Sequence, residues 1–379
     1  MTATMERIVV VGNGIAGLTA CDTLRDRGFT GDLVVVGSEE CAAYSRPALS
    51  KALLKPDADL TAHELPASGH GARELLGRSA TGLDADRRVV VLDDGEELSY
   101  DGLVIASGSR ARRLSEHPRE LTLRDLADAH AVRDALAGAP DVVVLGGGVL
   151  GMEVASGAVA AGCRTTLVAT SEPMSRQLGA HVSGLLTASA RVQGLEIVVV
   201  DGAVVEERDG CPVVVSDTGR VFAADVLISA VGDQPNIEWL AESGLLTDGV
   251  LSVDAHGRVR DDIVAAGDVA HWGGLPRLAL WTNAIEQAKV AASALLDPDA
   301  PELAFQHYFW TEQFGHSVKA VGDLPVYGAP EVISGEAGGT PAVLRWTHPD
   351  GSRTAIAIDQ RIPIPKLRRL TAPGADGNG

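Results

Sequence analysis

The chain has 379 residues and a formal net charge of −19, with 32 Lys and Arg against 51 Asp and Glu. This length predicts two or three domains, and the acidic balance excludes non-specific binding to nucleic acid or to an anionic membrane. No apolar run approaches the ~20 residues of a membrane helix, and no signal-like segment opens the chain, so we expect a cytoplasmic protein. The four cysteines form no CxxC pair, so neither a metal site nor a disulfide framework is expected.

The first predicted element is a buried strand at 7–11, a run of β-branched residues that is apolar on both faces. It leads into Gly12-Asn13-Gly14-Ile15-Ala16-Gly17, a GxGxxG turn, and then into a helix predicted over 18–27 and a strand over 33–36. In such a turn the first glycine permits the tight bend. The second lets a pyrophosphate approach the backbone, and the third lets the helix pack on the strand.

The same arrangement returns later in the chain. A predicted strand at 141–145 leads into Gly146-Gly147-Gly148-Val149-Leu150-Gly151, followed by a helix at 152–161 and a strand at 165–168. One such motif alone is weak evidence, whereas two copies in a strand–turn–helix context are specific. Two dinucleotide sites in one chain predict a flavoprotein that a nicotinamide coenzyme reduces, with an α/β fold built on two Rossmann-like domains.

The remaining predicted elements fill the spaces around these two units. We expect hairpins at 88–98 and 213–222, buried strands at 102–106 and 225–230, and helices at 129–137 and 283–296. The segment Asp297-Pro298-Asp299-Ala300-Pro301 predicts a domain boundary. Beyond it, aromatic residues gather at 305–314 and alternating apolar segments follow at 342–346 and 354–358, which predicts a small α+β domain. We expect the tail at 371–379 to be disordered.

The string Tyr44-Ser45-Arg46-Pro47-Ala48-Leu49-Ser50-Lys51 resembles the Y-x-R-P-P-L-S-K motif of ferredoxin reductase-like flavoproteins. These are the oxygenase-coupled ferredoxin and rubredoxin reductases and, more distantly, apoptosis-inducing factor. Segments 105–109, 263–269, 281–284 and 307–310 support the resemblance, which runs from about 6 to about 322. It implies an FAD-binding domain split into 1–109 and 237–303, an NAD(P)-binding domain inserted at 110–236, and a C-terminal α+β interface domain at 304–370.

The resemblance also implies the residues that contact FAD. Gly12, Gly14 and Gly17, with the backbone of Ile15 and Ala16, would hold the pyrophosphate. The acidic pair that binds the adenosine ribose falls at Ser38 and Glu39; because the serine departs from the pattern, Glu39 would do this work. Ala80 would give backbone contacts to the adenine, and Asp268 would bind the ribityl or pyrophosphate region. Further FAD contacts fall at Arg46, Lys51, Ser107, Gly108, Arg124, Gly267, Leu280, Trp281 and Trp310.

Lys51 and Glu153 are the expected catalytic residues. In the family they form a pair beside the flavin ring, where the cation favours the negative charge of reduced flavin and the carboxylate positions the nicotinamide or the lysine. The alternative for Glu153 is a plain helix-surface carboxylate, and a core Trp310 would look the same from sequence. The nicotinamide coenzyme would contact Gly146, Gly148, Val149, Leu150, Gly151, Glu153 and Gly232.

The coenzyme's identity is less sharply predicted. Members specific for NADH place an acid at the end of the second strand, where this chain has Ala169-Thr170; Glu172 follows in a loop. Without a strand-end carboxylate a 2′-phosphate is no longer repelled, and Arg176 or Arg164 could bind it. A slight preference for NADPH over NADH follows, with weak binding of either as the alternative. Ala279, where the family often has Glu, removes one flavin-side contact.

The function implied by the resemblance is hydride transfer from NADPH or NADH to FAD, followed by single-electron transfer to a ferredoxin. Basic residues could form a docking patch for that iron–sulfur partner, or could be scattered solvated charges: Arg110, Arg112, Arg113, Arg361, Lys366, Arg368 and Arg369. A disulfide reductase is disfavoured because residues 46–50 hold no cysteine. An NAD(P)H oxidase or other flavin reductase, and a weakly catalytic flavin-binding module, remain alternatives. Both a monomer and a homodimer fit.

Overall fold

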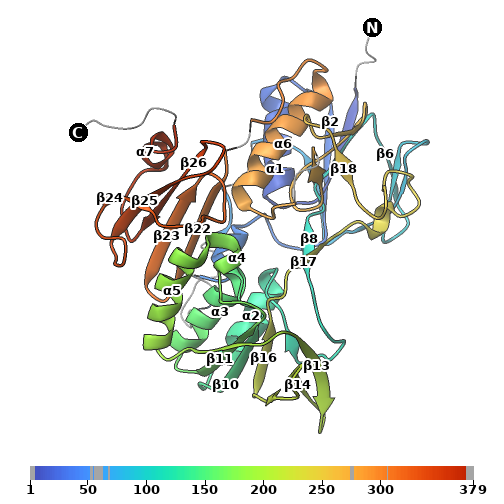
Figure 1. Cartoon of the computed structure of the whole chain (residues 1–379). Coiled ribbons are helices and arrows are strands. Elements are labelled where there is room, and N and C mark those ends of the chain that lie inside the picture. The colour runs from blue at the N-terminus through green and yellow to red at the C-terminus, as the bar shows by residue number, and fades with distance from the viewer. Residues whose placement is uncertain are drawn as a thin grey trace. The chain divides into compact units, whose positions relative to one another are not determined.

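The computed structural model describes residues 5–51, 54, 63–66, 69–273, 277–304 and 306–372. The chain divides into two compact units (Figure 1). The first unit comprises Met1–Ser45, Thr61–Arg110 and Gln234–Phe305, and the second comprises Arg46–Leu60, Ala111–Asp233 and Gln306–Gly379. Apart from its first two residues, the tail expected at 371–379 lies outside the described residues.

The first unit is built on a six-stranded sheet in the order β19-β20-β7-β1-β2-β3. At its centre β1 (Arg7–Val11) runs parallel to β2 (Asp32–Gly37) and β7 (Gly102–Ile105). The helices α1 (Ile15–Asp26) and α6 (Trp281–Leu296) lie side by side, because fully buried alanines such as Ala20 and Ala288 allow a close approach (Figure 1). The other elements of this unit are β3 (Arg73–Leu76), β4 (Ala80–Asp84), β5 (Val89–Leu92), β6 (Glu97–Ser99), η3 (Glu238–Leu240), β18 (Ser252–Val253), β19 (Arg258–Arg260), β20 (Ile263–Ala265) and β21 (His271–Trp272).

The second unit contains a five-stranded parallel sheet in the order β12-β11-β10-β16-β9. Its central strand β10 (Asp141–Leu145) is buried from Val142 onward, as expected of a parallel strand covered on both faces. The helix α3 (Val149–Ala160) packs on β10 and β11. The other elements here are η1 (Arg46–Ala48), β9 (Glu120–Leu121), α2 (Leu126–Leu136), β11 (Arg164–Ala169), α4 (Ser175–Leu178), α5 (Ala180–Val192), β12 (Glu196–Val199), β13 (Ala203–Arg208), β14 (Cys211–Ser216), β15 (Val221–Phe222) and β16 (Val226–Ser229).

The C-terminal part of the second unit is a five-stranded antiparallel sheet, β22-β23-β26-β25-β24. Its elements are β22 (Tyr308–Gln313), β23 (His316–Val321), β24 (Glu331–Ser334), β25 (Ala342–Thr347), β26 (Arg353–Ile358) and α7 (Ile364–Arg369). In addition, β8 (Ser109–Ala111) pairs with β17 (Asp233–Pro235).

Most of the predicted elements are present, with shifted helix starts. The strands expected at 7–11 and 141–145 are β1 and β10, and both hairpins are antiparallel pairs. The helices after the glycine turns begin at Ile15 and Val149, three residues earlier than expected, because the last residues of each GxGxxG motif already adopt helical geometry. Across the described residues, no helix combines the length and apolarity needed to cross a bilayer.

Candidate functional site: two glycine turns and a buried Lys–Glu pair

In the first glycine turn, which lies in the first unit, the first and third glycines of the motif have no room for a side chain, whereas the second glycine has. Gly12 has φ +121°, and a Cβ there would lie 2.0 Å from the carbonyl oxygen of Ala106. A Cβ at Gly17 would lie 1.8 Å from the carbonyl oxygen of Gly12. At Gly14, by contrast, a Cβ would meet nothing within 4 Å. The turn therefore leaves open space only where a pyrophosphate would approach the backbone.

The second turn, in the second unit, repeats this pattern. Gly146 has φ +114°, and a Cβ there would lie 2.2 Å from the carbonyl oxygen of Ala230. A Cβ at Gly151 would lie 1.9 Å from the carbonyl oxygen of Gly146. Around a Cβ at Gly148 the only neighbour within 4 Å in the described structure is Gln177 Nε2, at 3.7 Å. Two segments far apart in sequence thus build the same open cradle.

The helices that follow both turns present unfilled N-termini. Neither Gly14 nor Gly148, the N-cap residues of α1 and α3, supplies a side-chain cap, and neither helix has an acid in its first turn. The first N–H groups of a helix have no intrahelical acceptor, and the helix dipole makes that end positive. The residues expected to bind through their backbone, Ile15, Ala16, Val149 and Leu150, occupy these first turns. Both ends suit a diphosphate.

The segment after β2 carries the expected ribose-binding carboxylate. Glu39 is half-buried and its Oε2 accepts a hydrogen bond from the Tyr44 hydroxyl at 2.5 Å, whereas Ser38 is exposed. The Glu39 carbonyl oxygen accepts from the Gly77 amide at 3.1 Å, and the Gly37 carbonyl oxygen from the Arg78 amide at 2.9 Å. Glu39 is therefore held at the carboxyl end of β2, one strand from the first glycine turn.

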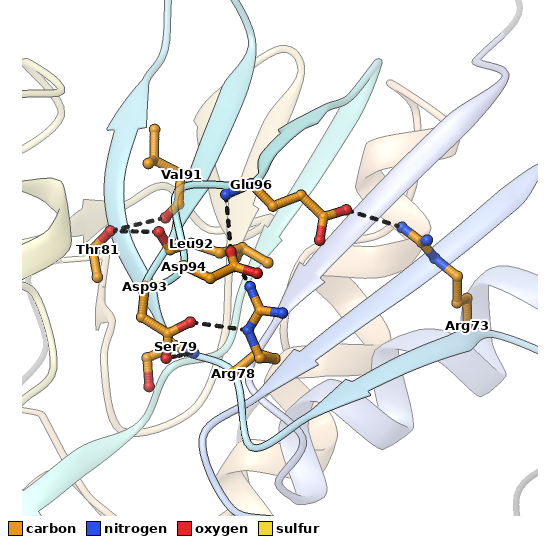
Figure 2. A network of polar contacts seen from close by, with 9 residues as sticks. All are labelled: Arg73, Arg78, Ser79, Thr81, Val91, Leu92, Asp93, Asp94 and Glu96. Carbon is orange, nitrogen blue, oxygen red and sulfur yellow. Dashed lines mark hydrogen bonds and ion pairs between the residues drawn. The ribbon is translucent and has the colours of Figure 1, made fainter.

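Ala80 is the first residue of β4, and its sequence neighbours Ser79 and Thr81 belong to a polar network. Figure 2 shows this network. Arg78 pairs with Asp93 at 3.0 Å and with Asp94, and the Thr81 hydroxyl donates to the carbonyl oxygens of Val91 and Leu92. Exposed ion pairs of this kind contribute little stability singly. Together they join the β3–β4 connection to the β5–β6 hairpin, which fixes the backbone expected to meet the adenine.

The loop after β7 and the turn after β20 complete the first unit's surroundings. Ser107 is tied to Asn236: its hydroxyl donates to the Asn236 carbonyl oxygen at 2.9 Å, and the Asn236 side-chain amide donates back at 2.8 Å. The Asn236 amide also donates to the Gly108 carbonyl oxygen at 3.0 Å. A Cβ at Gly267 would lie 3.1 Å from Ala16 Cβ. Asp268 therefore lies next to the start of α1, as the expected role requires.

Leu280 and Trp281, the remaining FAD candidates of the first unit, lie at the start of α6. Leu280 is the N-cap residue, without a side-chain cap, and both residues are half-buried. The roles of these first-unit residues toward FAD stay predictions.

In the second unit Lys51 and Glu153 form the expected pair. Lys51 Nζ lies 2.9 Å from Glu153 Oε2, and their side chains are 16% and 3% exposed. Lys51 Nζ also donates to the Pro47 carbonyl oxygen at 3.2 Å. Glu153 is therefore not a helix-surface carboxylate. A buried ion pair costs the desolvation of both charges, so its retention favours a functional reading over a stabilising one.

Trp310 lies near this pair, and the other candidates of the second unit make contacts of their own. Lys51 Nζ lies 6.0 Å from the ring centroid of Trp310, which stacks on Tyr308. Arg46 Nη1 donates to the Arg124 carbonyl oxygen at 3.0 Å. Gly232, with φ +100°, follows β16, and its carbonyl oxygen accepts from the Arg112 amide.

The structure corrects one candidate for the coenzyme's 2′-phosphate. Arg164 begins β11 and its Nε donates to Asp141 Oδ1 at 2.9 Å, at the start of the neighbouring strand. The glycine turn follows the other end of these strands, roughly 16 Å away at about 3.3 Å per residue. Arg164 therefore cannot reach a ribose at the turn. Arg176 in α4 is exposed, and Glu172 pairs with Arg191 at 2.9 Å.

The basic residues divide into two kinds. Arg110 pairs with Glu238 at 2.6 Å, and Arg113 donates to the carbonyl oxygens of His117 and Glu120, so both hold the chain's own structure. Arg112, which follows β8, is exposed, and four others are exposed in or next to α7: Arg361, Lys366, Arg368 and Arg369. We call these four the α7 basic patch.

Sequence reasoning missed the groups that hold the expected residues in place. Glu153 accepts from the hydroxyls of Ser50 and Thr311, and Gly267 donates to Gln287 Oε1 at 2.9 Å. Ser50 belongs to the recognised string around Arg46, which offered a signal. Thr311 and Gln287 stand in ordinary strand and helix sequences, and only the fold shows what they touch.

Comparison with known proteins identifies the family. The profile of the pyridine nucleotide-disulphide oxidoreductases matches residues 6–288. The chain belongs to this family. This confirms the predicted oxidoreductase class and the resemblance from which it came.

Individual members of the family cover nearly the whole chain. The ferredoxin reductase component of a chlorobenzene dioxygenase from Cupriavidus sp. (strain PS12) is 32% identical, over 96% of this chain and 92% of the relative. The ferredoxin–NAD(+) reductase component of a p-cumate 2,3-dioxygenase system from Pseudomonas putida is 35% identical, over 84% and 82%. The crystal structure of the covalent putidaredoxin reductase–putidaredoxin complex matches with a TM-score of 0.86 and 28% identity, over 97% and 93%. These matches confirm the predicted α/β fold class.

The four cysteines of this chain differ in burial. Cys21, Cys41, Cys163 and Cys211 all remain thiols. Burial raises the pKa of Cys21 to about 12, and burial also raises the pKa of Cys163. A redox-active cysteine needs a stabilised thiolate, so these two buried thiols are inert.

Proposed function

We propose that this chain is an FAD-dependent NADH:ferredoxin reductase of an oxygenase system. The observation that carries the proposal is the pair of glycine turns, each open only at its middle glycine and each followed by an uncapped helix N-terminus. Two dinucleotide cradles are what a flavoprotein reduced by a nicotinamide needs. The relatives' names, which include ferredoxin reductase components of dioxygenases, supply the electron acceptor.

The two units divide the binding work. The first unit binds FAD through Gly12, Gly14 and Gly17, with Glu39 on the ribose and Asp268 beside the turn. The second unit binds the nicotinamide coenzyme through Gly146, Gly148 and Gly151. In domain terms, we propose an FAD-binding domain from 1–109 and 237–303, a coenzyme domain at 110–236 and a C-terminal domain at 304–370.

When bound, FAD accepts a hydride and releases electrons one at a time. The chain's own contribution is position and charge. Lys51 supplies a fixed positive charge at a site with little solvent, where it is worth more than in water. Glu153 holds that charge in place at 2.9 Å. The roles of Arg46, Arg124 and Trp310 toward FAD remain predictions.

We propose NADH as the coenzyme, in place of the slight preference for NADPH that the sequence suggested. Relatives such as the p-cumate dioxygenase component are named as NAD(+) reductases. With Arg164 engaged at the far end of its strand, one of the two candidate phosphate-binding arginines is lost. Glu172, pinned by Arg191 just past β11, supplies a carboxylate near the ribose.

The electron acceptor docks on the α7 basic patch in this proposal. A ferredoxin is usually acidic, and a chain of net charge −19 repels it at long range unless local charges reverse the field. Arg110 and Arg113 are committed to internal contacts, which leaves the exposed α7 basic patch as the better candidate. The four cysteines remain thiols, which supports a cytoplasmic location.

The deciding experiment is stopped-flow reduction of the purified holoenzyme by NADH and NADPH, followed by anaerobic mixing with a [2Fe–2S] ferredoxin. We expect flavin bleaching within seconds by NADH, slower bleaching by NADPH, and reoxidation when ferredoxin is added. Reoxidation by oxygen alone would indicate an oxidase. Reduction slower than minutes with both coenzymes would indicate a flavin-binding module and overturn the proposal.

A further inference from the structure

The Glu153 carboxylate is surrounded by three donors from two separate stretches of sequence. Its Oε1 accepts from the Thr311 hydroxyl at 2.6 Å, and its Oε2 accepts from Lys51 Nζ at 2.9 Å and from the Ser50 hydroxyl. Only 3% of the residue is exposed, so these three donors replace its hydration. All the residues involved belong to the second unit.

The fold brings Thr311 next to Glu153 because β22, the strand that carries Thr311, packs against α3, the helix that carries Glu153. In β22 the buried residues Phe309, Thr311 and Gln313 alternate with Trp310 and Glu312, so these three share one face of the strand. β22 contacts α3. The end of β22 is attached to α3, because the amide of Phe314, the residue after β22, donates to the hydroxyl of Ser156 in α3 at 2.7 Å.

The segment that carries Ser50 and Lys51 meets the same face of α3. Glu153, Ser156 and Gly157 are three and four positions apart and so lie on one side of the helix. At Gly157 a Cβ would lie 3.1 Å from the side chain of Leu54, so the glycine admits the segment close to the helix. The helix face with Glu153 is thus covered by β22 and by the described residues Ser50, Lys51 and Leu54.

The direction of the hydrogen bonds limits what Glu153 can do. Gln313 Nε2 donates to Thr311 Oγ1 at 3.3 Å, and a hydroxyl has one proton, so Thr311 donates that proton to Glu153. Ser50 and the Lys51 ammonium are donors as well. A carboxylate, which only accepts hydrogen bonds, can take all three of them.

Lys51 is fixed in turn by the carboxylate. Two of the three ammonium protons are used, one on Glu153 and one on the Pro47 carbonyl oxygen at 3.2 Å. Within the described part of the chain, no further hydrogen-bond acceptor for Lys51 is present, so one N–H remains for a bound reactant.

We propose that Thr311 and Ser50 are positioning residues that lock Glu153 as a fixed anion, so that Lys51 presents one N–H and a full positive charge to the bound reactants. In this arrangement Glu153 is an electrostatic anchor and not a general base. The inference deepens the proposed function and rests on it for the identity of the reactants. The lock itself belongs to the protein without ligands.

The test compares Thr311→Val, Thr311→Ser and Ser50→Ala with a matched control, Thr354→Val. Thr354 is as fully buried as Thr311, but its hydroxyl donates to the Asp323 carbonyl oxygen at 2.6 Å and not to Glu153. We expect Thr311→Val to slow flavin reduction by NADH about tenfold, the effect of one lost hydrogen bond to a charged group. Thr311→Ser should restore the rate, and Thr354→Val should change it less than about twofold.

A second readout needs neither cofactor nor turnover. Acetic anhydride labels lysines according to how free their amines are, and peptide mass mapping can compare Lys51 with the exposed Lys289 in one digest. We expect Lys51 to label faster in Thr311→Val and Ser50→Ala and to match the wild type in Thr311→Ser and Thr354→Val.

The two readouts separate the inference from the proposed function. If NADH fails to reduce the wild-type flavin while labelling follows the expected order, the lock stands and the function falls. Unchanged Lys51 labelling in Thr311→Val and Ser50→Ala would overturn the lock. A Thr311→Val rate defect of equal size in a Glu153→Gln background would also overturn it, since Thr311 would then act without Glu153.

Discussion

Burial separates Lys51–Glu153 from an ion pair of the same length on the surface. Lys289 and Glu286 are also 2.9 Å apart, but their side chains are 51% and 57% exposed. We expect Lys51→Met to lower the free energy of unfolding by about 3 kcal/mol, because it leaves a buried carboxylate without its counter-charge. Lys289→Met should cost less than about 0.5 kcal/mol.

Urea denaturation of the two variants measures both values. The hydroxyls of Ser50 and Thr311 still solvate Glu153 in Lys51→Met, which keeps the expected loss at the lower end for a broken buried pair. Equal losses in the two variants would show that burial gives the Lys51 pair no special weight.

The cysteines allow a second prediction at single residues. Cys21 and Cys163 are buried with raised pKa values, whereas Cys41 and Cys211 are half-buried. We expect a thiol reagent such as dithionitrobenzoate at pH 8 to modify two thiols rapidly in the native protein and four in denaturant. A rapid native count of four would contradict the assigned burial.

The raised pKa of Cys21 also has a pH consequence. An unfolded chain's cysteine loses its proton near pH 9.0, whereas the folded chain keeps the proton on Cys21 up to about pH 12. Between these values the unfolded state binds fewer protons, so the free energy of unfolding falls as the pH rises. Denaturation curves at pH 8, 9 and 10 measure this loss.

At the scale of elements, the glycine turns separate folding from binding. At Gly14 and Gly148 a Cβ has room in the fold, so Ala there should change the stability of the cofactor-free protein by less than about 1 kcal/mol. Each should instead weaken its own ligand at least tenfold, because the methyl group occupies the space of the pyrophosphate. FAD content reports Gly14→Ala, and NAD⁺ titration reports Gly148→Ala.

Gly17→Ala is the contrasting variant. Its Cβ would lie 1.8 Å from the Gly12 carbonyl oxygen, so α1 would have to move away from β1. We expect this variant to lose several kcal/mol or to fail to fold. Normal FAD content in Gly14→Ala would show that the first turn does not hold the pyrophosphate.

The same elements show how far sequence carries the fold. Apolar runs such as 141–145 gave the strands almost to the residue, because a strand covered on both faces requires continuous apolarity. The helix starts were three residues late, since glycine-rich sequence gives no helical periodicity although its backbone at Ile15 and Val149 is already helical. Hydrophobic periodicity indicates which face of a helix or strand is buried, but not the residue at which the element begins or ends.

The candidate site also has a part that the sequence predicts and a part that only the fold shows. Glycine spacing predicted the two turns, because local geometry alone dictates them, whereas the roles of the residues in the string around Arg46 stay predictions. Arg164 was wrong as a phosphate candidate because its position depends on which end of β11 faces the turn and on its partner Asp141. The sequence could not predict the role of Thr311, because its partner Glu153 lies in α3, far from β22 in the sequence.

At the scale of the whole molecule, the exposed α7 basic patch contrasts with the net charge of −19, and this contrast leads to a prediction about partner docking. A Lys366→Glu/Arg368→Glu variant should raise the KM for an acidic ferredoxin about tenfold at low salt and reduce its salt dependence, because the steering charge is reversed. Flavin reduction by NADH should stay unchanged, since neither residue belongs to the coenzyme site.

Arg208→Glu is the matched control for that variant. Arg208 is an exposed cation of the same unit, in β13, where it pairs with Glu206. A similar rise in KM in Arg208→Glu would indicate a general effect of net charge. An unchanged KM and salt slope in the α7 variant would remove this patch as the docking surface.

The interleaving of the two units has a consequence for synthesis on the ribosome. The first unit closes only with Gln234–Phe305, and the second only with the C-terminal stretch that carries Thr311. A nascent chain therefore exposes β1 and the first glycine turn long before α6 arrives to cover them. We therefore expect the first unit to take up flavin only after its last stretch, Gln234–Phe305, has been translated.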